Sequence, residues 1–182
     1  KETGLWGTRF DTPYYLSQGV QTGFHIWMLY FYDKRNIQYK ERIIDSCLKS
    51  QNRLGGFGVA MNSSSCEDID SLDPLARLYY EVDYRRSDIR DAFEKALPWV
   101  LVNQNHDGGW VFRKYQNFQY GHTLMSVGPR ESSMFPTWFR SLSIAYVYQI
   151  LDNPRNEHFK WHFLDCPGLQ FFQLSNKSGE KL

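Results

Sequence analysis

The sequence predicts an all-α protein, an α/α toroid built from helical hairpins, of which this chain supplies about three. The first observation is a repeated motif: Gln-Asn, two variable residues, Gly-Gly and an aromatic residue occupy positions 51–57 and again positions 104–110. A partial copy, Gly-Leu-Trp-Gly, occupies positions 4–7, so the aromatic residues recur about every fifty residues. The second observation is that strongly apolar and amphipathic helical patterns alternate between the motifs. Such hairpins bury their faces against their neighbours.

The motif itself is predicted to be architectural. Its glutamine can bond to backbone at a helix end, its glycines allow a tight turn, and its aromatic residue can pack between neighbouring hairpins. We therefore expect any chemistry to lie further along the chain, where the next inner helix begins.

The first two hairpins follow one order. Residues 14–32 are apolar on most faces and predict a buried inner helix, and residues 38–50 carry one apolar stripe and predict an outer helix. The second inner helix is expected to begin at Cys66 or Ser71 and to end near Val82, with Pro74 in its first turn. An amphipathic outer helix over 88–103 follows, and Pro98 is expected to kink it.

The third unit is longer than the other two. Residues 111–130 show no clear period and predict a loop, and residues 131–151 predict an apolar helix with Pro136 in its first turns. Residues 156–164 suggest a short last helix, so the repeat domain is predicted to span 1–174, with a solvated tail over 175–182.

The first copy of the motif lacks its glutamine, which predicts that Lys1 is not a natural N-terminus. Three hairpins do not close a ring, so upstream repeats or a partner chain are expected to complete the toroid.

The composition excludes several classes of function. Lys and Arg number 21 against 20 Asp and Glu, giving a net charge of +1, and no basic stripe indicates a nucleic-acid partner. The three cysteines are odd in number and widely spaced, which favours a reducing, cytoplasmic location over a disulfide framework. No apolar run reaches the about 20 residues of a membrane span, which leaves only peripheral membrane contact. Aromatic residues make up 17% of the chain, enough to fill a core or to line an apolar cavity.

The repeated motif, at this spacing and between helices, resembles the QW-type repeat of terpenoid cyclases and of protein prenyltransferase β subunits. The resemblance covers nearly all of the chain but only about half of such a toroid. It implies a ring of hairpins around an apolar cavity and an isoprenoid or other apolar small molecule as the partner.

The acidic stretch over 67–78 resembles the D-x-D-D region of class II cyclases of the squalene-hopene type. That resemblance implies Asp70 as the general acid and Asp68 as the first aspartate, while Ser71 replaces the last aspartate, which in the family orients and acidifies its neighbour. Two carboxylates at the mouth of an apolar cavity would raise one pKa. The D-D-x-x-D motif of metal-dependent ionisation is absent, and no cofactor is implied.

The same acidic residues have a purely structural interpretation. Ser65, Asp68, Asp70 and Asp73 crowd a helix start, where acids and hydroxyls cap free N–H groups and interact favourably with the helix dipole. Cys66, Asp68 and His122 are the only loose candidates for the zinc ligands of prenyltransferases, and their order and location favour a buried cysteine and a loop histidine, so no metal site is predicted.

Three residues outside the acidic stretch are further candidates for the cavity wall. Trp27 and Trp138 could stabilise a cation through their ring faces, although aromatic residues at helical spacing are also ordinary core residues. Glu131 opens the third inner helix at the place equivalent to the acidic motif, where capping explains it equally well.

Two functions therefore remain open from the sequence. The first is protonation-initiated cyclisation of an isoprenoid, an isomerase or lyase activity with Asp70 as the acid. The second is a non-catalytic or divergent toroid that binds an apolar ligand or a protein partner, with the acids as caps.

Overall fold

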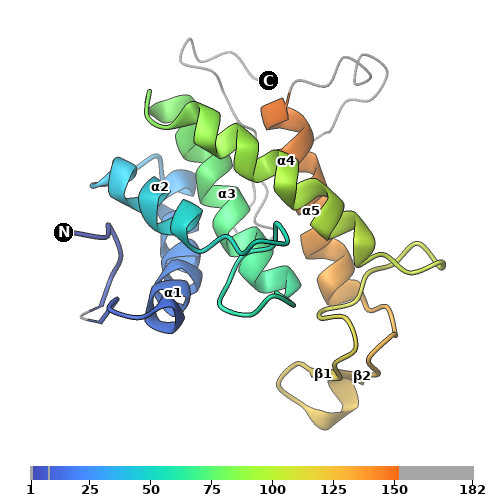
Figure 1. Ribbon diagram of the computed structural model, residues 1–182. Coiled ribbons are helices and arrows are strands. Elements are labelled where there is room, and N and C mark those ends of the chain that lie inside the picture. The colour runs from blue at the N-terminus through green and yellow to red at the C-terminus, as the bar shows by residue number, and fades with distance from the viewer. Residues whose placement is uncertain (1, 8, 152–182) are drawn as a thin grey trace.

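A computed structural model describes residues 2–7 and 9–151 (Figure 1). It contains five α-helices: α1 (Pro13–Tyr32), α2 (Lys40–Lys49), α3 (Ser65–Glu81), α4 (Arg86–Val102) and α5 (Met134–Leu151). Between α4 and α5 lies a small antiparallel hairpin of β1 (Phe118–Gln119) and β2 (Ser126–Val127), with the 3-10 turn η1 (Thr123–Met125) at its tip. This part of the chain is thus mostly helical, as predicted.

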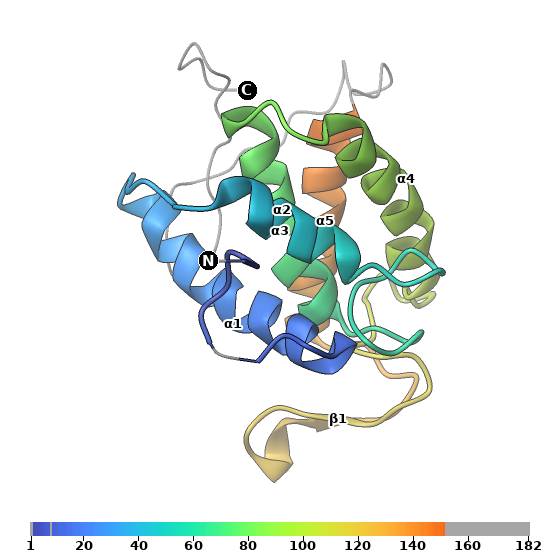
Figure 2. The same ribbon diagram turned by 60° about the vertical axis from the view of Figure 1, so that its left-hand side comes forward.

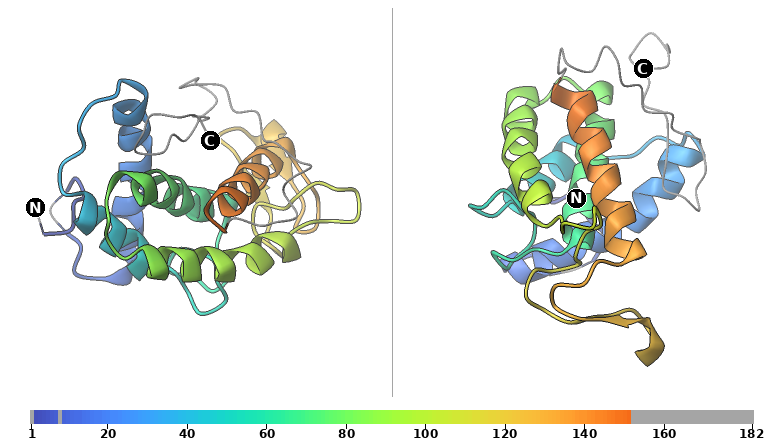
Figure 3. Two further views of the ribbon diagram at one scale, coloured as in Figure 1. Left: turned by 90° about the horizontal axis from the view of Figure 1, so that it is seen from above. Right: turned by 90° about the vertical axis from the view of Figure 1, so that its right-hand side faces the viewer.

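The helices alternate between two layers around α3. Helices α1 and α5 pack against α3, while α2 packs against α1 and α3, and α4 packs against α5 and α3. Seen from above, α4 runs beside the row formed by α3 and α5 (Figure 3, left). Helices predicted to be apolar (α1, α3 and α5) and helices predicted to be amphipathic (α2 and α4) thus alternate between the two layers along the chain.

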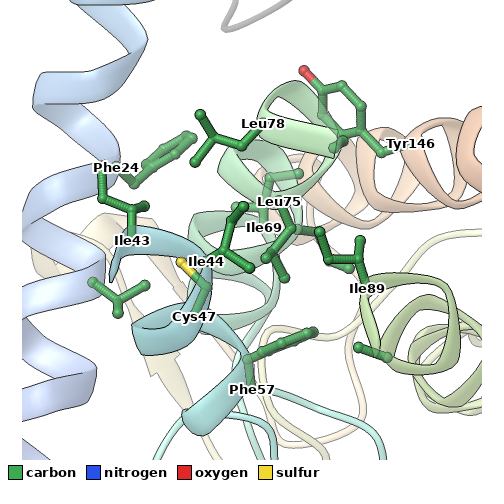
Figure 4. Packing of buried hydrophobic residues seen from close by; sticks show 14 of the residues in the cluster. Phe24, Ile43, Ile44, Cys47, Phe57, Ile69, Leu75, Leu78, Ile89 and Tyr146 are labelled. Atoms are coloured by element: carbon green, nitrogen blue, oxygen red, sulfur yellow. The ribbon is translucent and has the colours of Figure 1, made fainter. Parts of the chain in front are cut away.

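The core joins all five helices (Figure 4). Its members include Phe24 of α1, Ile44 of α2, Leu75 of α3, Ile89 of α4 and Tyr146 of α5. Helix α3 is the most enclosed, because all of residues 67–78 are buried, including three aspartates and Arg77. The energetic problem of the fold is therefore the burial of charge in its central helix.

The two complete motifs form the same turn. In the first, the N–H of Asn52 donates to the carbonyl of Gly56 at 2.8 Å, and Nε2 of Gln51 donates to the carbonyl of Gly55 at 2.9 Å. The second copy repeats both bonds at 2.8 and 2.9 Å, from Asn105 and Gln104. Nε2 of Gln51 also donates to the carbonyl of Ala92 in α4 at 2.8 Å. These bonds confirm the predicted role of the glutamine at a helix end.

The first glycine of each motif provides a matched test of this architecture. Gly55 and Gly108 have φ of +95° and +85°, but a Cβ on Gly55 would lie 2.0 Å from the carbonyl oxygen of Lys95, while nothing lies within 4 Å of one on Gly108. We expect Gly108→Ala to lower the free energy of unfolding by about 1–2 kcal/mol, the penalty of the left-handed backbone alone. Gly55→Ala should lower it by at least about 1–3 kcal/mol more, because α4 must also move. Equal losses in urea unfolding would contradict the assignment of Gly55 to a contact between hairpins.

The aromatic residues of the motifs differ in their burial. Phe57 is fully buried and Trp110 is largely so, and Nε1 of Trp110 donates to the carbonyl of Val100 at 3.1 Å. Trp6 of the partial copy is 43% exposed and lies beside Trp27, with ring centroids 6.0 Å apart. The aromatic residues of the two complete motifs are thus buried, as packing between hairpins requires, whereas that of the partial copy is exposed.

Several local predictions are corrected by the structure. Helix α3 begins at Ser65, so Pro74 lies in its middle rather than in its first turn. Helix α1 is not buried on most faces, since Tyr14 and Leu29 are more than half exposed. The predicted loop over 111–130 contains the β1–β2 hairpin.

Two further predictions concern the helix ends and the membrane. Pro136 lies in the first turn of α5, as predicted, and α4 continues as an α-helix through Pro98. Among the described residues, no helix combines the length and the apolar character that a membrane crossing requires. Lys1, the predicted helix over 156–164 and the tail over 175–182 lie outside those residues.

Candidate acidic site on the central helix

Four acidic side chains are buried in the first half of α3: Glu67, Asp68, Asp70 and Asp73 are each at most 7% exposed. An N-terminal helix turn favours negative charge, but a buried carboxylate is destabilising unless it is paired and hydrogen-bonded. The partners of each acid therefore distinguish a structural role from a chemical one.

Glu67 is a capping residue. Its carboxylate accepts hydrogen bonds from the N–H of Ser64 at 2.7 Å and from the hydroxyl of Ser64 at 2.8 Å, while the N–H of Glu67 donates back to that hydroxyl. This reciprocal arrangement is a capping box. Arg113 completes the environment with an ion pair to the same carboxylate oxygen at 2.6 Å.

Asp68 joins the glycine turn to two other helices. One carboxylate oxygen accepts from the N–H of Phe57 and the hydroxyl of Ser63, both at 2.9 Å. The other accepts from Nε1 of Trp99 in α4 at 3.0 Å and from Nη1 of Arg140 in α5 at 2.8 Å. Burial raises the pKa of Asp68, and the charge of Arg140 opposes that rise. Both oxygens are thus committed to holding the hairpins together.

The second motif supports this structural role of Asp68. There the N–H of Trp110 donates to the hydroxyl of Thr137 at 3.0 Å, in the same way that the N–H of Phe57 donates to Asp68. Asp68 and Thr137 both lie in the first turns of the helix that follows their motif. A polar acceptor at this position therefore belongs to the repeat, whatever its charge.

Asp73 belongs to a second buried ion pair. Nε and Nη2 of Arg77 donate to its two oxygens, each at 2.8 Å, and the hydroxyl of Tyr146 donates to Oδ1 at 2.6 Å. The guanidinium of Arg77 also lies 5.0 Å from the ring centre of Phe31 in α1. A two-pronged contact of this kind fixes both side chains in place.

Asp70 differs from the other three acids. It is 3% exposed, and no described residue donates a hydrogen bond to its carboxyl group or forms an ion pair with it. Burial raises its pKa well above the usual range, and the negative charges of Asp73, Glu67 and Asp68 raise it further. Three arginines thus pair with three of the four acids, and Asp70 is the acid whose neutral form this environment favours.

Two cysteine thiols lie near Asp70. Burial raises the pKa values of the Cys47 and Cys66 thiols, so neither is a thiolate nucleophile at neutral pH. Pro74 stands four residues after Asp70 and has no N–H to donate to the backbone carbonyl of Asp70. Both features set this turn of α3 apart from an ordinary helix turn.

The remaining predicted site residues are dispersed. The hydroxyl of Ser71 lies 3.3 Å from that of Ser50 in a hydrogen bond, and no bond to Asp70 is seen among the described residues. Trp27 is buried in α1 with no partner for its indole N–H, and Trp138 in α5 is partly buried with its ring centre 4.9 Å from that of Phe139. Glu131 is exposed before α5 and accepts from the N–H of Gly128 at 2.8 Å. Their roles in a cavity wall stay predictions.

The sequence reasoning missed the basic partners of the acids. Arg77 and Arg140 each stand among apolar residues of a helix, and both are at most 5% exposed. An arginine is almost never buried unless it is paired, so an arginine in an apolar helical pattern indicates a buried acid nearby. That signal was available and would have indicated that some of the acids are paired with buried arginines, although not which ones.

Two other kinds of site were considered. A surface hollow of about 550 Å³ is lined by residues 36–42 and Val82 at the start of α2, away from the four acids. Within residues 2–7 and 9–151, no three His, Cys, Asp or Glu side chains lie close enough together to hold a metal ion.

Comparison with family models, with curated proteins and with solved structures gave no match. The environment of Asp70 is therefore the feature from which a function for this chain can be proposed.

Proposed function

We propose that this chain is part of an α/α toroid of the terpenoid-cyclase type and that it cyclises an isoprenoid by protonating one of its double bonds. The observation that carries the proposal is Asp70, a buried carboxyl group with no described partner and a pKa raised well above its usual range. Protonation of an alkene requires an acid that is still protonated at neutral pH, and this environment provides one.

The arrangement of the helices supports the toroid. In the proposed toroid α1, α3 and α5 are the inner helices and α2 and α4 the outer helices, an assignment supported by the packing of α3 against both α1 and α5. Each complete motif binds its next inner helix through one backbone N–H, at Asp68 or at Thr137. Further hairpins added with the same geometry would extend this arc toward a ring.

The proposed step transfers one proton. The O–H bond of the Asp70 carboxyl group breaks and its electron pair stays on the carboxylate, while the alkene π pair forms the new C–H bond. The cation that remains on the more substituted carbon is attacked by a second double bond of the same chain, which closes a ring. Loss of a proton from a neighbouring carbon ends the reaction, and a proton returns to Asp70, so the overall change is an isomerisation.

The other acids contribute by their charge and by their rigidity. Asp73, Glu67 and Asp68 disfavour the ionised form of Asp70, so its carboxyl group keeps a proton to a higher pH. The ion pairs of Asp68 with Arg140 and of Asp73 with Arg77 hold these charges in place at 2.8 Å. Ser71 stands beside Asp70 in the sequence but is bonded to Ser50, so the carboxyl group keeps its proton for the substrate.

The test is turnover in deuterium oxide. The full chain is incubated with squalene and with geranylgeranyl diphosphate, and products are analysed by mass spectrometry. We expect cyclic products carrying deuterium on the protonated carbon, which is bonded to the carbon where the ring closes, and we expect Asp70→Asn to lower kcat by at least about a hundredfold. Asp88→Asn, which removes an acid on the exposed side of α4, is the matched control and should turn over at the parental rate.

Three outcomes separate the proposals. Equal turnover by Asp70→Asn and the parent removes Asp70 as the acid. Binding of a polyprene without conversion supports the alternative of a toroid that binds an apolar ligand. Quenching of tryptophan fluorescence measures this binding. Failure of the parent both to bind and to convert any polyprene rejects both cyclisation and the binding of an isoprenoid ligand.

A further inference from the structure

The β1–β2 hairpin projects from the helical body as a separate arm (Figure 2). Its strands pair Phe118 with Val127 and Gln119 with Ser126, and η1 forms the turn between them. The view of Figure 1 and the right view of Figure 3 also show the arm extending away from the helices. Nothing in the proposed proton transfer uses this arm, so its surface calls for a separate account.

The end of the arm is apolar and exposed. Leu124 is 88% exposed and Met125 is 56% exposed. Most exposed apolar residues of a protein are isolated and unremarkable, but these two are adjacent and occupy the outermost turn. Tyr115 and Tyr120, also more than half exposed, lie in the same segment between this turn and the helices.

The arm is built to hold that end in place. The ring of Phe118 stacks on Phe112 with centroids 3.8 Å apart, and the ring of Tyr120 lies 4.6 Å from that of Phe135 at the start of α5. The N–H of Tyr120 donates to the carbonyl of Met125 at 3.1 Å. An apolar tip on a preformed base loses little conformational entropy on binding.

The net charge at the base is positive. The ammonium group of Lys114 donates to the carbonyl of Val102, and the guanidinium of Arg130 lies 5.4 Å from the ring centre of Tyr115. No described carboxylate forms an ion pair with either side chain. Arg113 is neutralised by Glu67, while Glu131 accepts from the N–H of Gly128 and keeps its negative charge, so Lys114 and Arg130 leave the base with a net positive charge. From the tip to the base, the arm is thus apolar, then aromatic, then cationic.

We propose that this arm, residues 112–131, anchors the protein to a lipid bilayer containing anionic lipids, with Leu124 and Met125 inserted below the headgroups. The order of side chains matches the order of layers in a bilayer: acyl chains, the interface that favours tyrosine, and the anionic phosphates. A protein partner would need a broad complementary patch of roughly 800 Å² on this side, whereas the arm presents a narrow convex end. The proposal is independent of the proton-transfer chemistry at Asp70.

The test is flotation of the full chain with vesicles. Vesicles of phosphatidylcholine alone and with phosphatidylglycerol are titrated, and the bound fraction of protein is measured. We expect the parent to bind the anionic vesicles. The double variant Leu124→Asp with Met125→Asp should bind them about tenfold or more weakly. Lys114→Gln with Arg130→Gln should weaken only the dependence on phosphatidylglycerol. Leu54→Asp, which replaces a leucine 53% exposed in the first glycine turn, is the matched control and should bind as the parent does.

Circular dichroism and the unfolding midpoint establish that each variant is folded. The proposal is overturned if the parent does not float with either vesicle, or if Leu124→Asp with Met125→Asp floats as well as the parent. It is also overturned if the arm instead mediates self-association, seen as a dimer in sedimentation that the same two substitutions abolish.

Discussion

Replacement of Arg140 by methionine is expected to lower the free energy of unfolding by about 3–5 kcal/mol. Arg140 is fully buried, and its guanidinium lies 2.8 Å from the carboxylate of Asp68, which is also fully buried. Methionine fills much of the same volume but leaves the carboxylate without its counter-charge. The same guanidinium donates to the carbonyls of Val111 and Phe112, so the segment that follows the second glycine turn loses contacts as well.

Two further variants identify the cause of that loss. Asp68→Asn combined with Arg140→Met removes both charges and should recover part of the stability, because no unpaired ion remains in the core. Arg42→Met breaks an exposed pair with Asp45 at 3.7 Å and should change the free energy of unfolding by less than about 1 kcal/mol. Urea unfolding followed by circular dichroism measures all of these changes. A loss below about 1 kcal/mol for Arg140→Met would mean that the pair is not what holds the hairpins together.

The architecture was predictable from the sequence where it depends on neighbouring residues. The turn over 51–57 closes through bonds between residues at most four positions apart, so the same letters give the same turn at 104–110. The apolar stripe of α2 likewise depends only on residues within that helix. The predicted helix began two residues too early and ended one residue too late. Local chemistry repeated at a regular spacing is enough to indicate helical hairpins.

The site was predictable only in part, because the fate of each acid depends on distant residues. Arg140, which pairs with Asp68, lies 72 positions away in the chain, and Tyr146, which binds Asp73, lies 73 positions away. The sequence shows four acids at a helix start, and all four are compatible with capping. Only the fold shows that Glu67 caps, that two aspartates are paired, and that Asp70 is left over.

The hairpin escaped prediction for a different reason. Its strands have two residues each, too few to show an alternation of apolar and polar residues. Pro74 led to a wrong prediction, because a proline usually marks the first turn of a helix and this one lies in the middle of α3. Tertiary burial on both sides of α3 overrides that local preference.

The parent protein is expected to lose stability as the pH rises above about 4, by an amount that Asp70→Asn abolishes. The pKa of Asp70 is raised in the folded state by burial and by the charges of Asp73, Glu67 and Asp68. Between the unfolded pKa of about 3.9 and the raised folded value, the folded chain therefore holds a proton that the unfolded chain has released. Stability from this group is complete below the lower value and declines as the pH rises through that window, by about 1.4 kcal/mol per pH unit.

The measurement is the difference in free energy of unfolding between the parent and Asp70→Asn, taken by urea unfolding at steps from pH 4 to pH 8. Titrating groups outside this acidic cluster are common to both proteins and cancel in the difference. Asparagine keeps the size of the side chain and cannot ionise, so the variant should become the more stable protein as the pH rises. A constant difference across this range would show that Asp70 ionises normally when folded, and it would remove the basis for its role as a proton donor.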